Sequence, residues 1–303
     1  MLKKLVWIPI VSVVSACSPL GIVNGISRVH DVEERRDIAY GTLERQQLDL
    51  YLPPLDERRK TGAGNTPTIL FFYGGSWNSG SRADYRFVGR RLASEGYVVG
   101  VADYRLYPEV RYPEFLQDSA GAVRKFSELV RSDELAQWQP EEKLTLMGHS
   151  AGAYNVAMLA LDARWLKSEG LERLDVLKNW VGLAGPYDLY PIALEDVKPV
   201  FFFPDYPENS NPIEFIEQSD IPVLLLAPED DDLIDTHRHT ITFAKKLRDA
   251  GKSVEQIDIK GTSHTTLIGT MSPLLFFKGS SVDVINEFLD QNPKQINLTI
   301  PFK

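Results

Sequence analysis

Short apolar runs alternate with amphipathic stretches along most of the chain, and this alternation predicts strands that are followed by helices. The clearest apolar run is TILFFY at 68–73, and a continuous run of this length is typical of a strand buried on both faces of a parallel sheet. The segment 85–95 carries its apolar residues at helical spacing, and Gly96 follows it as a helix stop. One strand and one helix are therefore expected here.

The same alternation continues toward the C-terminus and predicts an α/β fold. Further strands are expected at 97–102, 143–147, 180–183, 222–227 and 254–259, with an edge strand or hairpin within 40–52. Further helices are expected at 115–130, 153–166, 235–250 and 282–289. Strands that alternate with helices imply right-handed crossovers, and hence a mostly parallel twisted sheet with helices on both faces.

One segment breaks this rhythm. Residues 190–220 are rich in proline and aromatic residues and include three consecutive phenylalanines at 201–203. The segment predicts either a small inserted cap or a surface excursion packed on the core, and the sequence favours neither.

The composition of the 303-residue chain fits one globular domain, which we expect at 37–290 and to be followed by a tail at 291–303. The formal net charge is −9 and there is no long basic run, which argues against a nucleic-acid partner because phosphate binding needs clustered lysine and arginine. No ligand cluster has the spacing of a metal site, so neither a metal nor an organic cofactor is predicted.

The N-terminus has the pattern of a secretory signal. Lys3 and Lys4 precede an apolar run at 5–14, and small residues follow it. This run is too short to span a membrane, which takes about 20 apolar residues. We therefore expect residues 1–16 to be a signal peptide.

Cys17, the only cysteine of the chain, follows this signal directly, and VSAC resembles the lipobox of bacterial lipoproteins. The resemblance implies that Cys17 is lipidated and becomes the mature N-terminus, whereas an ordinary cleaved signal would leave it without a role. Ser18 resembles the sorting pattern of outer-membrane lipoproteins, which implies a cell-envelope protein anchored on the periplasmic side of that membrane. Residues 17–36 then look like a polar tether.

The strongest chemical signal is GHSAG at 148–152, a G-x-S-x-G placed between a predicted strand and a predicted helix. In this setting a serine lies on a sharp turn with its hydroxyl exposed, so Ser150 is the candidate nucleophile. The amide of Ala151 then lies at a helix N-terminus, where it can face an oxyanion.

A serine hydroxyl needs a base, and five histidines are available. His264 follows the last predicted strand and so lies at the carboxyl edge of the sheet, where sites of open α/β folds lie. His149 lies inside the turn and cannot readily reach back to Ser150, and His237 and His239 are expected to be exposed. The orienting acid should come from the acidic run 229–232, whose other members are expected to be solvated.

A second motif, GGSW at 74–77, follows the first buried strand. Paired glycines let the backbone approach a substrate closely, and their amides can join that of Ala151 in an oxyanion hole. Trp77, Tyr154 and the phenylalanines at 201–203 are candidates for a substrate pocket, with ordinary core packing as the alternative for each.

From about residue 40 to residue 289 the chain resembles the α/β-hydrolase superfamily, and most of all its carboxylesterase branch with an HGGxW or HGGG oxyanion motif, which also holds arylformamidases. The matching segments are YGGSW, GHSAG, PVLLLAPEDDDLID and IKGTSHTTLI. The resemblance implies that Asp231 is the acid, with Asp232 as the alternative, and that the amides of Gly75 and Ser76 join that of Ala151.

Two departures from the family pattern affect these assignments. Tyr73 replaces the usual histidine before the glycine pair, which leaves the geometry of the oxyanion loop open. Ala227-Pro228 replaces the usual His-Gly, and since Pro228 has no N–H, the register of the acid is less certain.

Together these features predict a serine esterase that acts through an acyl-enzyme on Ser150, with a small-molecule ester as its partner. An amidase or arylformamidase with the same three residues is the nearest alternative. A peptidase is less favoured because no large partner domain is present. A catalytically silent envelope protein that binds a partner is the alternative from a different class.

Overall fold

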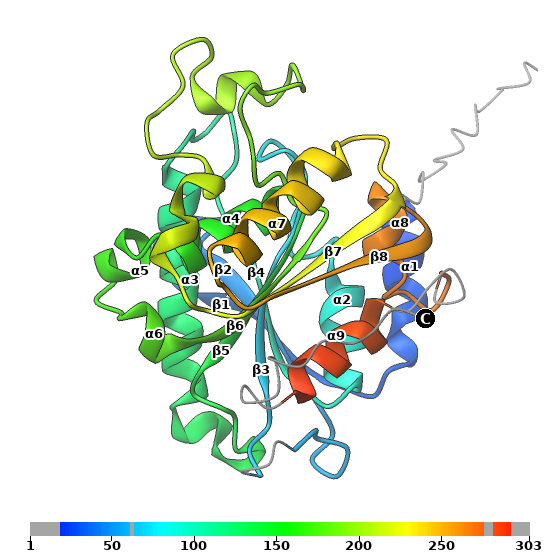
Figure 1. Ribbon diagram of the computed structural model, residues 1–303. Helices are drawn as coiled ribbons and strands as arrows, with labels where there is room; N and C mark the ends of the chain where they lie inside the picture. The colour runs from blue at the N-terminus through cyan, green and yellow to red at the C-terminus, as the bar shows by residue number, and fades with distance from the viewer. Residues whose placement is uncertain (1–18, 61–63, 276–280, 292–303) are drawn as a thin grey trace, which may run out of the picture.

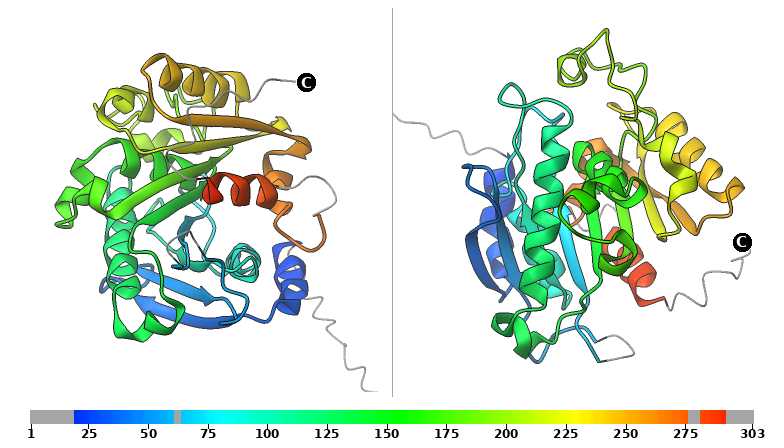
Figure 2. Two further views of the ribbon diagram at one scale, coloured as in Figure 1. Left: turned by 60° about the horizontal axis from the view of Figure 1, so that its bottom comes forward. Right: turned by 90° about the vertical axis from the view of Figure 1, so that its left-hand side faces the viewer.

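A single mixed sheet runs through the part of the chain that the computed structural model describes, residues 19–60, 64–275 and 281–291 (Figure 1). Its strands, in chain order, are β1 (Glu33–Ala39), β2 (Gln47–Leu52), β3 (Thr68–Phe72), β4 (Val98–Ala102), β5 (Leu144–His149), β6 (Leu177–Leu183), β7 (Val223–Asp230) and β8 (Val254–Ser263). In space the order is β1-β2-β4-β3-β5-β6-β7-β8. The left-hand view of Figure 2 shows the sheet twisting from the blue strands at one edge to the orange strand at the other.

The pairing confirms the predicted mostly parallel sheet. Strands β3 to β8 run parallel to one another, and the antiparallel pairs are those of β2 with β1 and with β4. All residues of β3 and β4 are buried, as a strand covered on both faces requires.

Helices cover both faces of the sheet. They are α1 (Pro19–Ile26), α2 (Arg86–Ser94), α3 (Glu114–Val130), α4 (Ala151–Leu161), α5 (Arg164–Ser168), α6 (Arg173–Val176), α7 (Thr242–Asp249), α8 (His264–Gly269) and α9 (Ser281–Asp290). Short 3₁₀ or π turns lie at η1 (Ser27–Val29), η2 (Asp133–Trp138), η3 (Lys198–Phe201), η4 (Pro212–Gln218) and η5 (His237–Ile241). In Figure 1, α3 and α5 lie on one side of the sheet and α2 and α9 on the other. None of the helices in the described ranges is long and apolar enough to cross a membrane.

The prediction of a polar tether at 17–36 is wrong for residues 19–36, which belong to the fold. They form α1, η1 and most of β1, and α1 packs at the start of α2. The Asn24 side chain accepts a hydrogen bond from the Phe87 amide (2.9 Å), and Glu34 pairs with the buried Arg90 (2.6 Å). Several charged residues of this segment therefore pair with the rest of the domain.

The predicted helix at 153–166 is interrupted. Asp162 adopts an extended conformation and separates α4 from α5. The predicted helix at 235–250 begins with the π turn η5. The short helix α8, which begins at His264, was not predicted.

The segment 190–220 rises above the carboxyl edge of the sheet (Figure 1) and contains η3 and η4. It combines the two expected arrangements, because its inner residues are part of the core while others are exposed. Phe201 is fully buried, whereas Phe202 and Phe203 are 41% and 52% exposed.

Candidate active site

Three predicted side chains meet at the carboxyl edge of the sheet. The Nε2 atom of His264 lies 2.9 Å from the Oγ atom of Ser150, and its Nδ1 atom lies 2.9 Å from one carboxylate oxygen of Asp231 and 3.1 Å from the other. The side chains of His264 and Asp231 are only 6% and 2% exposed. Ser150 follows β5, Asp231 follows β7 and His264 follows β8. The carboxyl ends of these strands lie along the same edge of the parallel sheet, which brings the three side chains together.

The turn that carries Ser150 is strained, as the G-x-S-x-G motif predicts. Ser150 has a φ of 54° and a ψ of −120°, a backbone conformation that is costly for a residue with a side chain. A Cβ atom on Gly148 would overlap the backbone of Gly152, and one on Gly152 would overlap the Phe72 carbonyl of β3. The two glycines are therefore required because the turn packs directly on itself and on the neighbouring strand.

The loop after β3 is equally tight and lies beside this turn. Gly75 has a φ of 132°, and Ser76 and Trp77 also have positive φ values. A Cβ atom on Gly74 would lie 2.8 Å from the Ser150 Cβ atom, so the backbone of the loop closely approaches the nucleophile.

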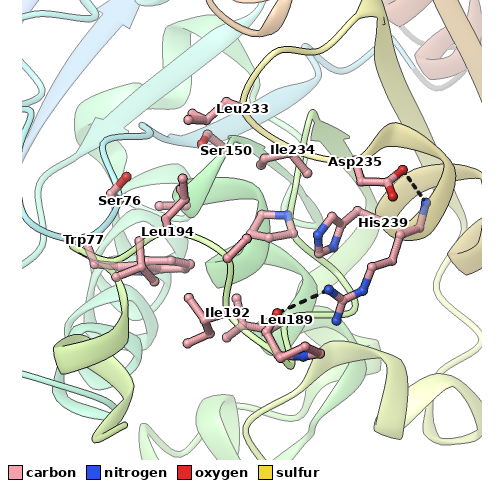
Figure 3. Close-up of a pocket in the computed structure, with 16 residues that line it drawn as sticks. Ser76, Trp77, Ser150, Leu189, Ile192, Leu194, Leu233, Ile234, Asp235 and His239 are labelled. Carbon is pink, nitrogen blue, oxygen red and sulfur yellow. Dashed lines mark hydrogen bonds between the residues drawn. The ribbon is translucent and has the colours of Figure 1, made fainter.

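The predicted oxyanion residues lie beside the nucleophile. Ser76 lines the same cavity as Ser150 (Figure 3), and Ala151 is also part of its wall. Gly75 lines a second cavity that also contains Ser150. Ala151 is the first residue of α4, where backbone N–H groups have no partner within the helix. These amides can therefore donate to an oxyanion that forms next to Ser150.

Tyr73 stabilises the oxyanion loop in place of the usual histidine. Its ring is fully buried and stacks on Tyr104 with centroids 4.8 Å apart, and the Tyr104 hydroxyl donates to the Tyr73 carbonyl (2.8 Å). Arg45 donates both to the Tyr73 hydroxyl (3.2 Å) and to the Gly80 carbonyl further along the loop (3.1 Å). The departure from the family motif therefore leaves the loop well supported.

The acid is Asp231 by geometry, and Asp232 is exposed. The amides of Leu233 and Ile234 donate to the Asp231 carboxylate at 2.9 and 2.8 Å, which fixes its position despite Pro228. Burial raises the pKa of the Asp231 carboxyl, but the hydrogen bond and charge of His264 and the two amides outweigh this effect, so its pKa lies below the ordinary value. The carboxylate thus stays ionised beside the imidazole.

His149 takes part in the site in a way that sequence reasoning missed. It does not act on Ser150; its Nε2–H donates to the backbone carbonyl of His264 at 3.1 Å. Burial, followed by the charge of His264, lowers the pKa of His149 to about 3, so the ring remains neutral. The signal that could have found this contact is the position of His149 directly before the nucleophile.

The pocket predictions are met in part. Trp77 lines the cavity at Ser150, and its indole N–H donates to Asn155 (2.9 Å), which holds the ring in place. Tyr154 is fully buried and packs edge-on against Trp77 with centroids 5.1 Å apart, so it supports the pocket wall from behind instead of lining it. Phe201 packs on Trp77 in the same way (5.0 Å).

Two hollows meet at Ser150 within the described residues. We call the first, of about 260 Å³, the Trp77 compartment; its walls include Trp77, Ala151, Leu189, Leu194, Val197 and His239. We call the second, of about 500 Å³, the His264 compartment; its walls include Val23, Tyr85, Phe87, His264, Ile268 and Leu275. His239, which was expected to be exposed, is therefore a buried wall residue.

The described ranges hold no group of three or more histidine, cysteine, aspartate or glutamate side chains arranged to bind an ion. The lipidation candidate Cys17 and the signal at 1–16 lie outside the described residues, as does nearly all of the predicted tail at 291–303.

Comparison with known proteins gives one family match and several similar sequences. The model of the BD-FAE family matches residues 48–247. The isoprenylcysteine alpha-carbonyl methylesterase ICME of Arabidopsis thaliana is 26% identical over 252 residues, which are 77% of this chain and 57% of that protein. The kynurenine formamidase of Danio rerio is 24% identical over 255 residues, which are 81% of this chain and 80% of that protein. The chain thus spans little more than half the length of ICME.

Solved structures of similar shape include esterases. Inhibited esterase B from Lactobacillus rhamnosis has a TM-score of 0.68 at 19% identity and covers 88% of this chain and 90% of its own. Esterase 2 of Thermogutta terrifontis, phosphonylated by sarin, has a TM-score of 0.64 at 20% identity, with coverage of 86% and 94%. At these identities the likeness concerns the fold, and it confirms the predicted α/β-hydrolase fold.

Proposed function

The chain belongs to the BD-FAE family, and we propose from this premise that it is a serine hydrolase that cleaves carboxylic esters through an acyl-enzyme. The observation that carries the proposal is the continuous hydrogen-bonded relay from Asp231 through His264 to Ser150, with backbone amides beside the nucleophile. A serine hydroxyl that is hydrogen-bonded to an imidazole, which is itself oriented by an ionised carboxylate, is the arrangement that activates a hydroxyl for acyl transfer.

The proposed reaction has two steps. The Oγ atom of Ser150 attacks the ester carbonyl carbon while Nε2 of His264 takes its proton, and the amides of Ser76 and Ala151 stabilise the oxyanion, each by about 3–4 kcal/mol. The imidazolium then gives its proton to the leaving alcohol oxygen. His264 next activates a water molecule that hydrolyses the acyl-enzyme, and Asp231 keeps the imidazole in the required tautomer throughout.

Chromogenic esters and a covalent probe test this proposal together. Wild-type protein is expected to hydrolyse p-nitrophenyl esters and to be labelled by a fluorophosphonate. Ser150→Ala should abolish labelling and lower kcat by about 10⁶-fold. Asp232→Asn is the matched control, since it removes a carboxylate next to the relay and should leave both readouts unchanged. A wild-type protein that is neither labelled nor active would contradict the proposal and favour a silent binding protein.

A second candidate is an amidase of the arylformamidase kind. It is supported by the similarity to the Danio rerio kynurenine formamidase, which extends over about four fifths of both chains. Both activities use the same relay, so rates must separate them. We expect a higher kcat/KM for p-nitrophenyl acetate than for N-formylkynurenine. A matched anilide serves to correct for the more reactive leaving group of the ester. The reverse order would favour the amidase.

The lipid anchor at Cys17 is a further part of the proposal. It is supported by the basic start, the apolar run and the VSAC sequence. Because α1 begins at residue 19, the anchor would hold the domain close to the periplasmic side of the outer membrane without a long tether. Fractionation on a density gradient tests this: wild type and Ser18→Ala should follow the outer membrane, and Cys17→Ser should not. An unchanged distribution of Cys17→Ser would refute the anchor.

A further inference from the structure

We propose that the two compartments at Ser150 divide the ester at its scissile bond, with the acyl group in the Trp77 compartment and the leaving alcohol in the His264 compartment. The substrates are then esters of a bulky apolar alcohol with a smaller, uncharged acyl group. This inference rests on the proposed esterase function and goes beyond it, because it names the substrate class and the residues that select it.

The direction of the substrate follows from the position of His264. Its Nε2 atom gives the proton to the leaving oxygen, so this oxygen must lie within hydrogen-bonding distance of the ring. His264 lines the larger compartment, whereas Ala151 lines the smaller one. Ser76, Ser150 and Leu233 line both compartments, so their boundary lies at the reacting carbon.

The larger compartment is suited to an apolar group. Its volume is about 500 Å³, and Tyr85, Phe87, Ile268 and Leu275 contribute to its walls. Each methylene that an alcohol buries there is expected to raise kcat/KM by up to about fourfold, the equivalent of the transfer free energy of one methylene. A longer or aromatic alcohol should therefore be favoured until the compartment is full.

The smaller compartment, of about 260 Å³, ends at polar residues and offers no free cation to a charged acyl group. The Asp235 carboxylate there accepts a hydrogen bond from the Arg238 amide (3.1 Å) and would repel an acyl anion. Figure 3 shows Asp235 and His239 at the end opposite Trp77. Arg238 is engaged by Asp188 (3.2 Å) and donates to the backbone carbonyls of residues 190 and 191. His239 accepts a hydrogen bond from the Asp188 amide (3.3 Å) through Nδ1, and it is neutral. An uncharged acyl group of modest length fits these walls.

Helix α1 supplies the outer wall of the alcohol compartment. Val23 lines it together with Ile268 of α8, and α1 and α8 are neighbours in Figure 1. The next residue, Asn24, is bonded to the Phe87 amide and to the carbonyls of Ala83 and Asp84 (3.0 Å each), so the wall is held in place. Helix α1 precedes the region 48–247 that the family model matches. The selectivity for the alcohol group that α1 gives this chain is therefore not determined by the matched region.

Two substitutions, one in each compartment, test the division. Val23→Trp fills part of the alcohol compartment, and Leu194→Trp is its counterpart in the acyl compartment. Each variant and the wild type are assayed with two series: acetates of ethanol and 1-naphthol, and p-nitrophenyl acetate, butyrate and octanoate. Ratios within each series, normalised to the wild type, cancel differences in leaving-group reactivity.

Val23→Trp is expected to lower the ratio of 1-naphthyl to ethyl acetate by about tenfold or more, while the acyl-length ratios stay within about twofold. Leu194→Trp should do the reverse. If Val23→Trp does not fold, as judged by thermal unfolding, Leu275→Trp replaces it at the same wall. A Val23→Trp protein that folds and leaves the alcohol ratio unchanged, or that alters the acyl ratios instead, would overturn the inference.

The proposed esterase function and the proposed division of the substrate can be refuted separately. If the wild type hydrolyses none of the esters and is not labelled at Ser150, the proposed esterase function fails, and the division of the substrate fails with it. If the wild type is active but the alcohol ratio does not respond at Val23 or Leu275, only the inference is wrong.

Discussion

Lowering the pH from 7 to 5 should destabilise the protein through His149, the buried imidazole behind the nucleophile. Its pKa is about 3, because burial and then the charge of His264 oppose protonation, whereas an ordinary histidine titrates at 6.5. Between these two values the unfolded chain binds a proton that the folded protein excludes. The stability that neutral His149 contributes is therefore present above pH 6.5 and is lost as the pH falls from 6.5 toward 3.

The size of the effect follows from the two pKa values. A pH of 5 lies about 1.5 units below the ordinary imidazole pKa, and each unit is worth about 1.4 kcal/mol. Protonation of the unfolded chain at this pH therefore lowers the free energy of unfolding by about 2 kcal/mol. His149→Gln removes the titration and keeps a side-chain N–H that can reach the His264 carbonyl, which His149 contacts at 3.1 Å.

Urea unfolding of the wild type and His149→Gln at pH 7 and pH 5 measures this contribution. Every other titrating group, including His239, is common to both proteins, so the difference between the two pH responses isolates His149. The wild type should lose about 2 kcal/mol more than the variant. Equal losses would refute the reasoning.

Three further outcomes are expected. Asp231→Asn should lower kcat by about 10⁴-fold at unchanged folding, because the imidazole loses the partner that fixes its tautomer. A similar loss in Asp232→Asn would show instead that Asp232 is the acid. Gly152→Ala should destabilise the protein by about 3 kcal/mol in urea unfolding, because a Cβ atom would overlap the Phe72 carbonyl of β3. Gly25→Ala, where nothing lies within 4 Å of the added Cβ atom, should be neutral or stabilising. Equal effects of the two substitutions would contradict the packing argument. Asn155→Leu should cost about 1–3 kcal/mol by the same measurement, since it leaves a buried indole N–H without its acceptor, and an unchanged stability would show that this bond is unimportant.

The parts of the fold that the sequence predicts best are those in which one local pattern decides the outcome. The run at 68–73 is apolar throughout, so it had to be a buried strand, and the glycines around Ser150 are required by the turn itself. His264 could be singled out because it follows the last strand of the sheet. Each of these assignments depends on residues that are adjacent in sequence.

The remaining parts depend on contacts between distant residues. Asp231 and Asp232 are chemically equivalent in the sequence, and the family resemblance was needed to prefer one of them. In the structure, the amides of the two residues after Asp232 donate to the Asp231 carboxylate and hold it in place. Helix α1 and strand β1 were missed because Asn24 and Glu34 find their partners about 60 residues away. Tyr154 was assigned to the pocket because aromatic residues near a nucleophile serve equally well as lining and as core.

The most direct test of the central claim is to trap the acyl-enzyme. The protein is mixed with p-nitrophenyl butyrate, quenched in acid within the first turnover, digested, and analysed by peptide mass spectrometry. A butyryl group on Ser150 in the wild type, and none in His264→Gln, is the predicted result. Continued hydrolysis with no acyl group on Ser150, or with the group on another residue, would contradict it.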